Sequence, residues 1–555
     1  MSQSSKTNNN SNETCPAELP NFCAQRHWSI FWILIICSVS VVAGRALTVE
    51  NHNANGDSPF FSANDRSRWC TIRSLGDQDV YEIDDAIRVG QPINWDTIDK
   101  VRHVGPDGEF HFYSSKPTLL PTLLAGIYKP IKFLMGKNLT EDTYFVVRLM
   151  LLLVSVIPWA VYLYFMAKTI NSVPVRDWSR YFVLACAGFG TYLSTFTNTL
   201  NNHLPAAVSV MISLYLLTMI WRKENTHWVR FFVCGFFAAF AAANELPAMA
   251  FFAFAGLLCL LKSPRKTLLA FVPAAILIAA GFFGTNFLAH GELKPAYAHR
   301  GDGNVVASIS GDFSEALDQN RLPAELRGAA AQVFEFEIPT VEKGAWPSSP
   351  SDEQRWVVRD EVSTTQFSIV NTSPNEFEIR DWGNWYDYPY SYWLETNAER
   401  KSEVDRGQES SELYAFHVLF GHHGIFSLTP IWLLSFAGMV ALMFGAKMAG
   451  RFQMRWLGLL GVSVSVVVIA FYLLRPPMDR NYGGVTSALR WLFWLAPIWL
   501  VSMLPVVDWL ARTNWGKGLC YVLLALSAIS ALYSMNNPWV HPWLYEIWDI
   551  TGLQR

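Results

Sequence analysis

Long apolar runs recur along the chain and limit what it can fold into. Most are close to the roughly 17–25 residues that a helix needs to cross a bilayer. Of the 555 residues 51% are hydrophobic and 16% are charged, below the roughly one quarter typical of soluble domains. The sequence therefore predicts an all-α polytopic membrane protein with about 11 transmembrane helices, at residues 28–44, 144–166, 181–199, 204–221, 229–243, 246–262, 267–288, 425–446, 456–474, 490–509 and 518–535.

Basic residues in the short loops predict the orientation. With the N-terminus inside, five loops lie on the inner face and every one of them is basic, as the positive-inside rule requires. We therefore expect a multi-pass protein of the bacterial cytoplasmic (inner) membrane, with a cytoplasmic N-terminus and an extracytoplasmic C-terminus. The inner loops carry Lys168/Arg176/Arg180, Arg222/Lys223/Arg230, Lys262/Arg265/Lys266, Lys447/Arg451/Arg455 and Arg512/Lys517.

The same pattern divides the chain into five segments. The first apolar run follows a long Ser/Asn-rich leader without a clean cleavage signature, which favours an uncleaved helix over a signal peptide. The predicted segments are a disordered cytoplasmic leader (1–27), an N-terminal membrane module with an outer loop at 45–142 (28–288), an acidic extracytoplasmic subdomain (289–424), C-terminal membrane helices (425–535) and an extracytoplasmic tail (536–555).

The segment 289–424 is too long for a simple connection. It holds 23 acidic residues against 11 lysines and arginines. Residues 311–327 read as an amphipathic helix, and residues 364–393 alternate and are aromatic, as strands do. We expect a small α+β subdomain. Its aromatic run at 382–393 suits stacking on sugar rings, and it suits equally well the packing of the subdomain onto the membrane surface.

The most polar stretch, residues 61–128, cannot cross a bilayer because unpaired polar groups are costly in hydrocarbon. A short helix starting near Asn64, with Asn64 as its N-cap, would place Asp65 at the positive end of the helix dipole. An ionised carboxylate there can act as a general base for a hydroxyl group. Alternatively, Asp65 only caps the helix or pairs with Arg66 or Arg68, and spacing alone favours this structural role.

Basic groups near two helix mouths are candidate anion ligands. Lys116 precedes an apolar helix and can meet a lipid headgroup or a phosphate, or it can snorkel at the interface. Residues 475–491 hold three arginines and a Gly-Gly turn, and arginines bind phosphate oxygens in pairs. Arg480 and Arg490 are therefore candidates for a phosphate clamp, or else ordinary interfacial arginines. Basic residues are scattered rather than gathered in one patch, which argues against nucleic-acid binding.

Other polar groups carry weaker signals. Asp84 and Asp85 with Arg88 read as a local ion pair. His203 is a single histidine, and His422 and His423 are adjacent to each other, so these residues lack the spacing of metal ligands. Glu245 would be costly in hydrocarbon, so it must reach the outer face or a partner. No P-loop, nucleophile elbow, HExxH or dinucleotide motif is present, and the eight cysteines form no disulfide framework.

The order of these motifs resembles the GT-C superfamily of membrane glycosyltransferases, most of all the branch that contains protein O-mannosyltransferases and the lipid A aminoarabinose transferase. In that branch the outer loop begins with an Asp-Glu-type motif followed by an arginine and an aromatic residue, and here residues 64–72 read NDRSRWCTI. A Gly-aromatic stretch and a Lys-Pro-Pro-Leu-like motif correspond to residues 108–120, with Thr118 in place of the second proline. Residues 147–149 partly match an Arg-Leu-Pro motif. The resemblance covers about residues 28–170 and is topological beyond them.

The resemblance implies an inverting glycosyltransferase that moves a sugar from a polyprenyl-phosphate-linked donor to an acceptor hydroxyl at the outer membrane face. Its partners would be that donor, a glycan, lipid or protein acceptor, and membrane lipids. The resemblance implies no nucleotide sugar. The sequence establishes no cofactor and leaves open a role for a divalent metal ion. The implied roles are general base for Asp65, donor-phosphate binding for Lys116, Arg66, Arg480 and Arg490, and lining of the site for Asp84, Asp85, His203, Glu245 and Tyr482.

Two other classes of protein fit the same residues. A carrier or flippase for a lipid-linked sugar would bind phosphate with the same basic groups and perform no chemistry. A non-catalytic envelope-assembly subunit would need neither phosphate binding nor chemistry. Asp65 separates the classes, because a flippase tolerates its replacement by asparagine and a transferase does not.

Overall fold

The computed structural model describes residues 20–52, 57–90, 93–222, 227–344, 354–393, 407, 409–445, 454–477 and 480–552. Most of the predicted leader lies outside these residues. Its described end, from Pro20, is already the start of helix α1 (Pro20–Leu47) rather than disordered chain. The basic residues Lys223, Lys447 and Arg451 also lie outside the described part.

The fold is mostly helical, as the sequence predicts. Within the described residues, six continuous helical stretches are long and apolar enough to cross a membrane. A seventh span is bent by 45°, and consists of η9 (Arg490–Leu495) and α18 (Ala496–Ser502) followed by α19 (Leu504–Leu510). The six are α1, α4–η1–α5 (Thr143–Leu151, Leu152–Val156, Ile157–Asn171), α7 (His203–Arg222), α10–η4–α11 (Pro264–Lys266, Thr267–Phe271, Val272–His290), α17 (Arg455–Leu473) and α20 (Asn514–Tyr533).

The predicted number of eleven spans is therefore not confirmed. Three further apolar helices are shorter than a full span: α8 (Trp228–Asn244), η3–α9 (Leu246–Ala248, Met249–Lys262) and α16 (Trp432–Met443). In the run 181–199, helix α6 (Asp177–Phe189) stops before Gly190. Residues 191–198 then turn irregularly into η2 (Thr195–Asn198), because hydroxyl groups there bond to nearby carbonyls, such as Thr195 Oγ1 to Tyr192 O at 2.6 Å.

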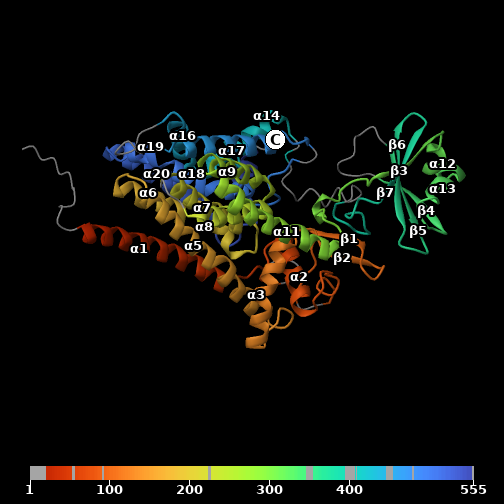
Figure 1. Ribbon diagram of the computed structural model, residues 1–555. Coiled ribbons are helices and arrows are strands. Elements are labelled where there is room, and N and C mark those ends of the chain that lie inside the picture. Colours follow the sequence, from red (N-terminus) through yellow and green to blue (C-terminus); the bar gives the residue numbers. More distant parts are fainter. Residues whose placement is uncertain are drawn as a thin grey trace, which may run out of the picture.

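Loops that the sequence assigns to one face also contact one another. At one end of the bundle, Arg222 Nη1 donates to Ser172 O (2.5 Å), and Arg176 pairs with Asp508 (2.9 Å). Figure 1 shows α6 and α19 at this end, and α2, the β1–β2 hairpin and the sheet towards the other. The grouping of the loops thus agrees with the predicted topology, and the assignment of one end to the cytoplasm stays a prediction.

The outer loop folds into a compact unit. It contains α2 (Ala63–Asp77), an antiparallel hairpin of β1 (Lys100–Val104) and β2 (Phe110–Ser114), and α3 (Leu119–Met135). The expected cap of α2 is wrong by two residues. Ser62 is the N-cap, and its Oγ accepts from the amide of Asp65 at 3.1 Å, whereas Asn64 lies inside the helix. Asp65 therefore still lies in the first turn of α2.

The 289–424 segment contains the predicted α+β subdomain. Five antiparallel strands lie in the order β3-β7-β6-β5-β4 (Figure 1). Two short helices, α12 (Ser314–Asp318) and α13 (Ala324–Ala330), replace the single helix predicted over 311–327, because Asn320 (φ 58°) and Pro323 interrupt it. The strands are β3 (Val305–Ser310), β4 (Pro339–Lys343), β5 (Gln354–Asp360), β6 (Gln366–Ser373) and β7 (Glu376–Asp381).

Most of the aromatic run after β7 is buried or packs against the outer loop, and Tyr390 is its one fully exposed ring. Trp385 and Tyr386 are buried with Val101 and Tyr113. The amide of Arg102 donates to Trp385 O at 2.8 Å. Stacking of the whole run on sugar rings is therefore excluded, and the rings attach the subdomain to the β1–β2 hairpin. The remaining short elements are η5 (Ala296–Ala298), α14 (Ser411–Leu419), α15 (Ile425–Leu428) and α21 (Trp543–Thr551).

The predicted orientation can be tested by labelling from outside the cell. Tyr390 is 90% exposed beyond the sheet, and Trp515 is 75% exposed at the start of α20. In a background with Cys15, Cys23 and Cys37 replaced by serine, a membrane-impermeant maleimide should label Tyr390→Cys on intact cells and should label Trp515→Cys only after lysis. The reverse pattern would invert the topology.

Candidate functional site

Asp65 is a buried carboxylate that joins α2 to the segment before α7. Its Oδ1 accepts from the amide of Leu200 (3.0 Å) and its Oδ2 from the amide of Phe61 (3.3 Å). The hydroxyl of Thr199 also bonds to it. Burial raises the pKa of Asp65 to about 6, and these hydrogen bonds limit the rise. The carboxylate therefore has a structural role at the start of α2. Three of its roughly four lone pairs accept hydrogen bonds, and one is left.

One turn further along α2, Arg68 is the first member of a chain of hydrogen-bonded polar side chains that ends at Arg490. Arg68 Nη2 donates to Asn202 Oδ1 (2.6 Å), and Asn202 Nδ2 donates to Glu245 Oε1 (2.7 Å). The same Glu245 oxygen accepts from His203 Nδ1. Arg490 Nη1 then donates to His203 Nε2 (2.9 Å). Four segments that are distant in the sequence therefore meet through side chains alone.

The direction of these bonds fixes the form of His203. A guanidinium has only donors, so Nε2 of His203 must accept from Arg490. The single ring proton then lies on Nδ1 and is donated to Glu245. His203 is consequently neutral in this arrangement. It donates to Glu245 and accepts from Arg490, so it links the two charged groups without direct contact between them.

Arg490 is further fixed by two contacts of its own. Its Nε donates to Gly483 O at 3.0 Å, and its guanidinium lies 4.8 Å above the ring of Trp539. Gly483 has φ 102°, a conformation that favours glycine, so the predicted Gly-Gly turn does shape the position of this arginine.

Lys116 is the third cation of the group. It forms a 2.8 Å ion pair with Asp99, and both side chains are mostly buried. Burial lowers the pKa of Lys116 to about 8; Asp99 opposes this effect, and the charges of Arg68 and Arg490 add to it. The pKa of Arg68 is likewise lowered to about 10, by burial first and by Arg490 second. Three cations therefore lie within electrostatic range of one another.

The positive charge of this group is only partly offset. Among the described residues, neither Arg68 nor Arg490 forms a direct ion pair with a carboxylate. Glu245 is shared between the two guanidiniums through Asn202 and His203. We call Arg68, Lys116 and Arg490 the cation cluster. Such buried and incompletely paired cations are costly without an anionic ligand.

Two residues predicted to bind phosphate lie in other contacts. Arg66 donates to the carbonyl of Asp96 and braces the outer loop. Arg480 donates to Arg475 O (2.8 Å) and Ser411 Oγ (2.8 Å) and packs over Tyr414. The structure places Arg490 and Lys116 in one cluster and attaches Arg480 to the start of α14.

The residues predicted to line the site also divide. His203 and Glu245 lie in the centre of the polar chain. Asp84 accepts from the amide of Phe112, and Asp85 pairs with Arg88, as the local spacing predicted. Tyr482 donates to Glu409 and stacks on His423 at 4.6 Å, and its neighbour Gly483 accepts from Arg490.

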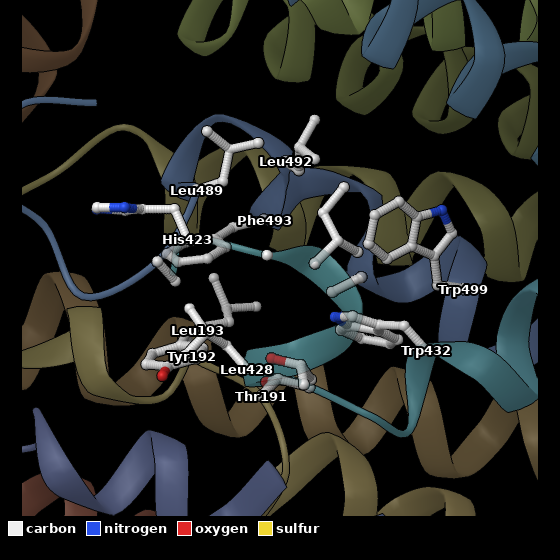
Figure 2. Close-up of a pocket in the computed structure, with 15 residues that line it drawn as sticks. Thr191, Tyr192, Leu193, His423, Leu428, Trp432, Leu489, Leu492, Phe493 and Trp499 are labelled. Atoms are coloured by element: carbon white, nitrogen blue, oxygen red, sulfur yellow. The ribbon is translucent and has the colours of Figure 1, made fainter. Parts of the chain in front are cut away.

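One cavity adjoins the cation cluster, and a second lies beside the polar chain. The first opens beside Arg68 and is lined by Pro117, Leu120 and Asn202 among others. The second is apolar. Figure 2 shows Trp432 and Trp499 at one side of it and His423 at the other. Phe493 lines the second cavity and packs edge-on against His203 at 5.9 Å, so this cavity borders the polar chain.

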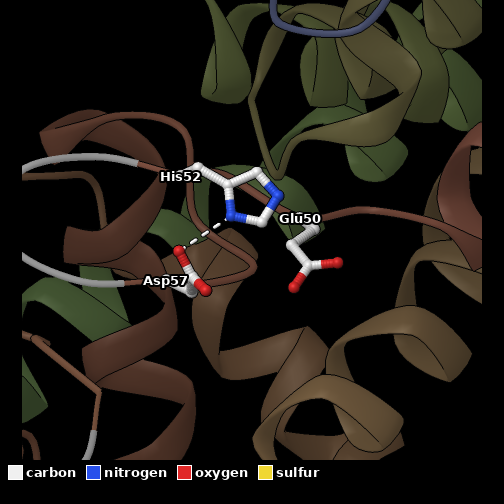
Figure 3. A group of neighbouring side chains, drawn as sticks. All are labelled: Glu50, His52 and Asp57. Carbon is white, nitrogen blue, oxygen red and sulfur yellow. Dashed lines mark hydrogen bonds and ion pairs between the residues drawn. The ribbon is translucent and has the colours of Figure 1, made fainter.

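One group of side chains in the described part of the chain has the composition of a metal site. Glu50, His52 and Asp57 place their ligand atoms within 4.8 Å of one another (Figure 3). All three are exposed, and the 2.8 Å bond between His52 and Asp57 accounts for their arrangement as a surface ion pair. They make no recorded contact with the cation cluster.

Sequence reasoning missed three members of the site. Arg68 was weighed only as a partner of Asp65, although it lies three residues further on the same helix face. Asn202 adjoins His203 in the sequence, and Asp99 is one of many acids in the outer loop. The positions of Arg68 and Asn202 beside predicted site residues were visible in the sequence. The pairing of Asp99 with Lys116 depends on the β1–β2 hairpin.

Comparison with known proteins gives likenesses of fold only. No protein-family model matches the sequence, and no curated protein does. Among solved structures, the chain is similar to the Saccharomyces cerevisiae protein O-mannosyltransferase Pmt1-Pmt2 complex bound to the sugar donor (TM-score 0.44, 10% identity, 94% of this chain and 92% of that chain). It is also similar to the oligosaccharyltransferase AglB from Archaeoglobus fulgidus in complex with an inhibitory peptide and a dolichol-phosphate (TM-score 0.44, 9% identity, 94% of this chain and 57% of that chain).

Both solved structures belong to the GT-C superfamily that the sequence motifs resemble. At about one tenth identity and a TM-score below 0.5, neither likeness carries an inference about the substrate or mechanism of this chain. The chemistry below therefore rests on the residues of its own site.

The structural role of Asp65 predicts a loss of stability. Asp65→Ala leaves the buried amides of Phe61 and Leu200 without an acceptor, which should cost about 1–3 kcal/mol of unfolding free energy. Asp65→Asn keeps one acceptor oxygen and should lose less. Denaturant unfolding in detergent would measure both, and an alanine variant as stable as wild type would contradict the bonding described here.

Proposed function

We propose that the chain is an inverting glycosyltransferase that takes its sugar from a polyprenyl-phosphate-linked donor and works at the outer membrane face. One observation carries the proposal: a buried carboxylate, Asp65, lies one helical turn from a cluster of three cations. The cation cluster supplies what a phosphate needs, and the carboxylate supplies what an acceptor hydroxyl needs. No nucleotide-binding motif accompanies them, which favours a lipid-linked donor over a nucleotide sugar.

The cation cluster supports binding of the donor phosphate. A guanidinium presents parallel donors that match phosphate oxygens, and burial strengthens such bonds by excluding water. Arg490 is held by Gly483, His203 and Trp539 and is therefore preorganised. The leaving phosphate gains one negative charge when the glycosidic bond breaks, so the same cations would stabilise the transition state more than the ground state.

Asp65 supports the role of general base. Its pKa of about 6 lies near the working pH, so it is mostly ionised at pH 7 yet basic enough to accept a proton. In the proposed step the acceptor oxygen attacks the anomeric carbon and the hydroxyl proton passes to Asp65. The bond between the anomeric carbon and the phosphate oxygen breaks, and its electron pair leaves with the lipid phosphate. A single displacement inverts the anomeric centre.

The apolar cavity of Figure 2 supports a lipid substrate. It lies among Trp432, Leu492, Trp499 and their neighbours, and Phe493 separates it from His203. A polyprenyl chain would place its first isoprene units there with its phosphate towards Arg490. Because the isoprenoid chain already lies in hydrocarbon in the bilayer, the cavity would contribute packing contacts rather than transfer from water.

Loss of turnover in Asp65→Asn is the direct test of this function. Purified protein is supplied with polyprenyl-phosphate sugars and an envelope extract, and release of free polyprenyl phosphate is measured. Wild type should turn over, and Asp65→Asn should lose at least a hundredfold, because general-base catalysis contributes about 10²–10⁴-fold. Asp508→Asn, which alters a carboxylate paired with Arg176 at the other end of the bundle, is the matched control.

The result separates the three classes of protein. Equal turnover in wild type and Asp65→Asn would remove Asp65 from the mechanism. Binding of the lipid phosphate without turnover in either protein, together with transport in vesicles, would indicate a carrier. Absence of both binding and turnover would leave an assembly subunit.

The pKa values predict a bell-shaped dependence of kcat/KM on pH. The base is active when ionised, so the rate should rise with pH through about 6, the pKa of Asp65. Lys116 binds phosphate when protonated, so the rate should fall above about 8, its own pKa. The maximum should lie between these values.

A conservative variant checks the assignment of the alkaline limb. Lys116→Arg keeps a cation well above pH 8, so it should move that limb upward and leave the acid limb in place. An acid limb near pH 4, the ordinary value of an aspartate, would contradict the role of Asp65.

A further inference from the structure

Glu245 occupies a break between two apolar helices. Its backbone is extended (φ −131°, ψ 104°), so α8 ends at Asn244 and η3 begins at Leu246. The side chain is 5% exposed. A carboxylate buried at a helix break in an apolar region is costly, and such a residue is retained where it has a specific task.

The bonds of Glu245 are arranged as two matching arms. In one arm, Asn202 donates to Glu245 and accepts from Arg68; in the other, His203 donates to Glu245 and accepts from Arg490. Each arm consists of one neutral side chain that has both a donor and an acceptor. One carboxylate oxygen therefore orients two guanidiniums that belong to different parts of the chain.

We propose that Glu245 is a positioning residue that sets the two guanidiniums of Arg68 and Arg490 so that both face one phosphate group. The inference rests on the proposed function in taking a phosphate as the ligand, and it assigns a task to a residue that touches neither the phosphate nor the sugar. Two guanidiniums that face one ligand would favour a phosphate, which offers oxygens to both, over a carboxylate, which offers only two.

The neutral relays explain why Glu245 does not simply neutralise the arginines. A direct ion pair would occupy the donors that a phosphate needs and would cancel the charge. In the observed arrangement each arginine gives one nitrogen to its arm. Arg68 Nη1 donates in addition to Asn64 O (2.9 Å) and Asn64 Oδ1, so Arg68 keeps fewer donors for a ligand than Arg490 does. Arg490 Nη2 makes no hydrogen bond among the described residues, so its N–H groups remain for a ligand. The relay fixes orientation and leaves the charge in place.

The alternative is that Glu245 only stabilises the break between α8 and η3. That role would need the side chain to bond to backbone groups of those helices. Its recorded hydrogen bonds, within the part of the chain that the structure describes, go instead to the side chains of Asn202 and His203. The backbone carbonyl of Asn244 is itself bonded by Asn202 at 2.8 Å, so the break is secured without the carboxylate.

Binding of a lipid phosphate by the full-length protein tests the inference. Undecaprenyl phosphate in detergent micelles is the probe, and its dissociation constant is measured for wild type, Glu245→Ala, Glu245→Gln and Arg490→Ala. Glu245→Ala should weaken binding at least tenfold, because both arms lose their acceptor. Glu245→Gln should stay within about threefold of wild type, because the amide oxygen can accept from both arms. Rescue by glutamine would show that geometry, not charge, is the contribution of Glu245.

A further pair of variants separates positioning from folding. Asn202→Ala and His203→Phe each cut one arm, so each should lose part of the affinity. In the protein that carries both changes, adding Glu245→Ala should cause no further loss. Asp508→Ala removes a carboxylate outside the cluster and should bind as wild type does. These variants keep the inference testable if Glu245→Ala alone is unstable.

The outcomes distinguish this inference from the function on which it rests. Unchanged binding in Glu245→Ala, with binding lost in Arg490→Ala, would overturn the positioning role and leave the phosphate site intact. Equal loss in Glu245→Gln and Glu245→Ala would overturn it in favour of charge. Failure of wild type to bind the lipid phosphate would overturn both. Normal binding results without any sugar transfer would contradict only the glycosyltransferase.

Discussion

Burial of positive charge is the constraint on which the rest of the site depends. Arg68 is buried and Lys116 and Arg490 are partly buried, and a cation in such a place must be hydrogen-bonded and at least partly compensated. Lys116 is compensated directly by Asp99. The two arginines are compensated through Asn202 and His203 by the single carboxylate of Glu245. The difference matters, because a direct pair is closed to a ligand, whereas a guanidinium held by a neutral relay keeps its charge and several of its donors.

The membrane helices serve to bring the parts of this network together. Its residues come from α2, from the start of α7, from the break after α8 and from η9, which are separated by up to about four hundred positions in the sequence. Three of these are places where a helix starts, stops or bends. Polar side chains are tolerated there because backbone irregularity and water access occur at the same points. The subdomain of β3–β7 attaches to the β1–β2 hairpin of the outer loop through Trp385 and Tyr386.

Much of the fold could be predicted from the sequence, because hydropathy and basic loops report directly on membrane insertion. The number of spans stays unconfirmed, and in one of the predicted spans Ser and Thr side chains between 191 and 197 interrupt the helix in an otherwise apolar run. Asp65, Lys116, His203, Glu245 and Arg490 could be named as candidates from residue type and place in a loop. The pairings of Asp99 with Lys116 and of Arg68 with Asn202 arise from tertiary contacts, and the separation of Arg480 from Arg490 depends on how residues 480–490 turn at Gly483. Those features have no signal in local spacing.

The most direct measurement is the location of the phosphate of a bound polyprenyl phosphate, determined by cryo-electron microscopy of the protein in lipid nanodiscs. We expect density for the phosphate within hydrogen-bonding distance of Arg68 and Arg490 and near Lys116. The isoprenoid chain should lead into the cavity beside Phe493. A phosphate held by Arg480 and the segment before α14, with the cation cluster empty, would contradict this expectation.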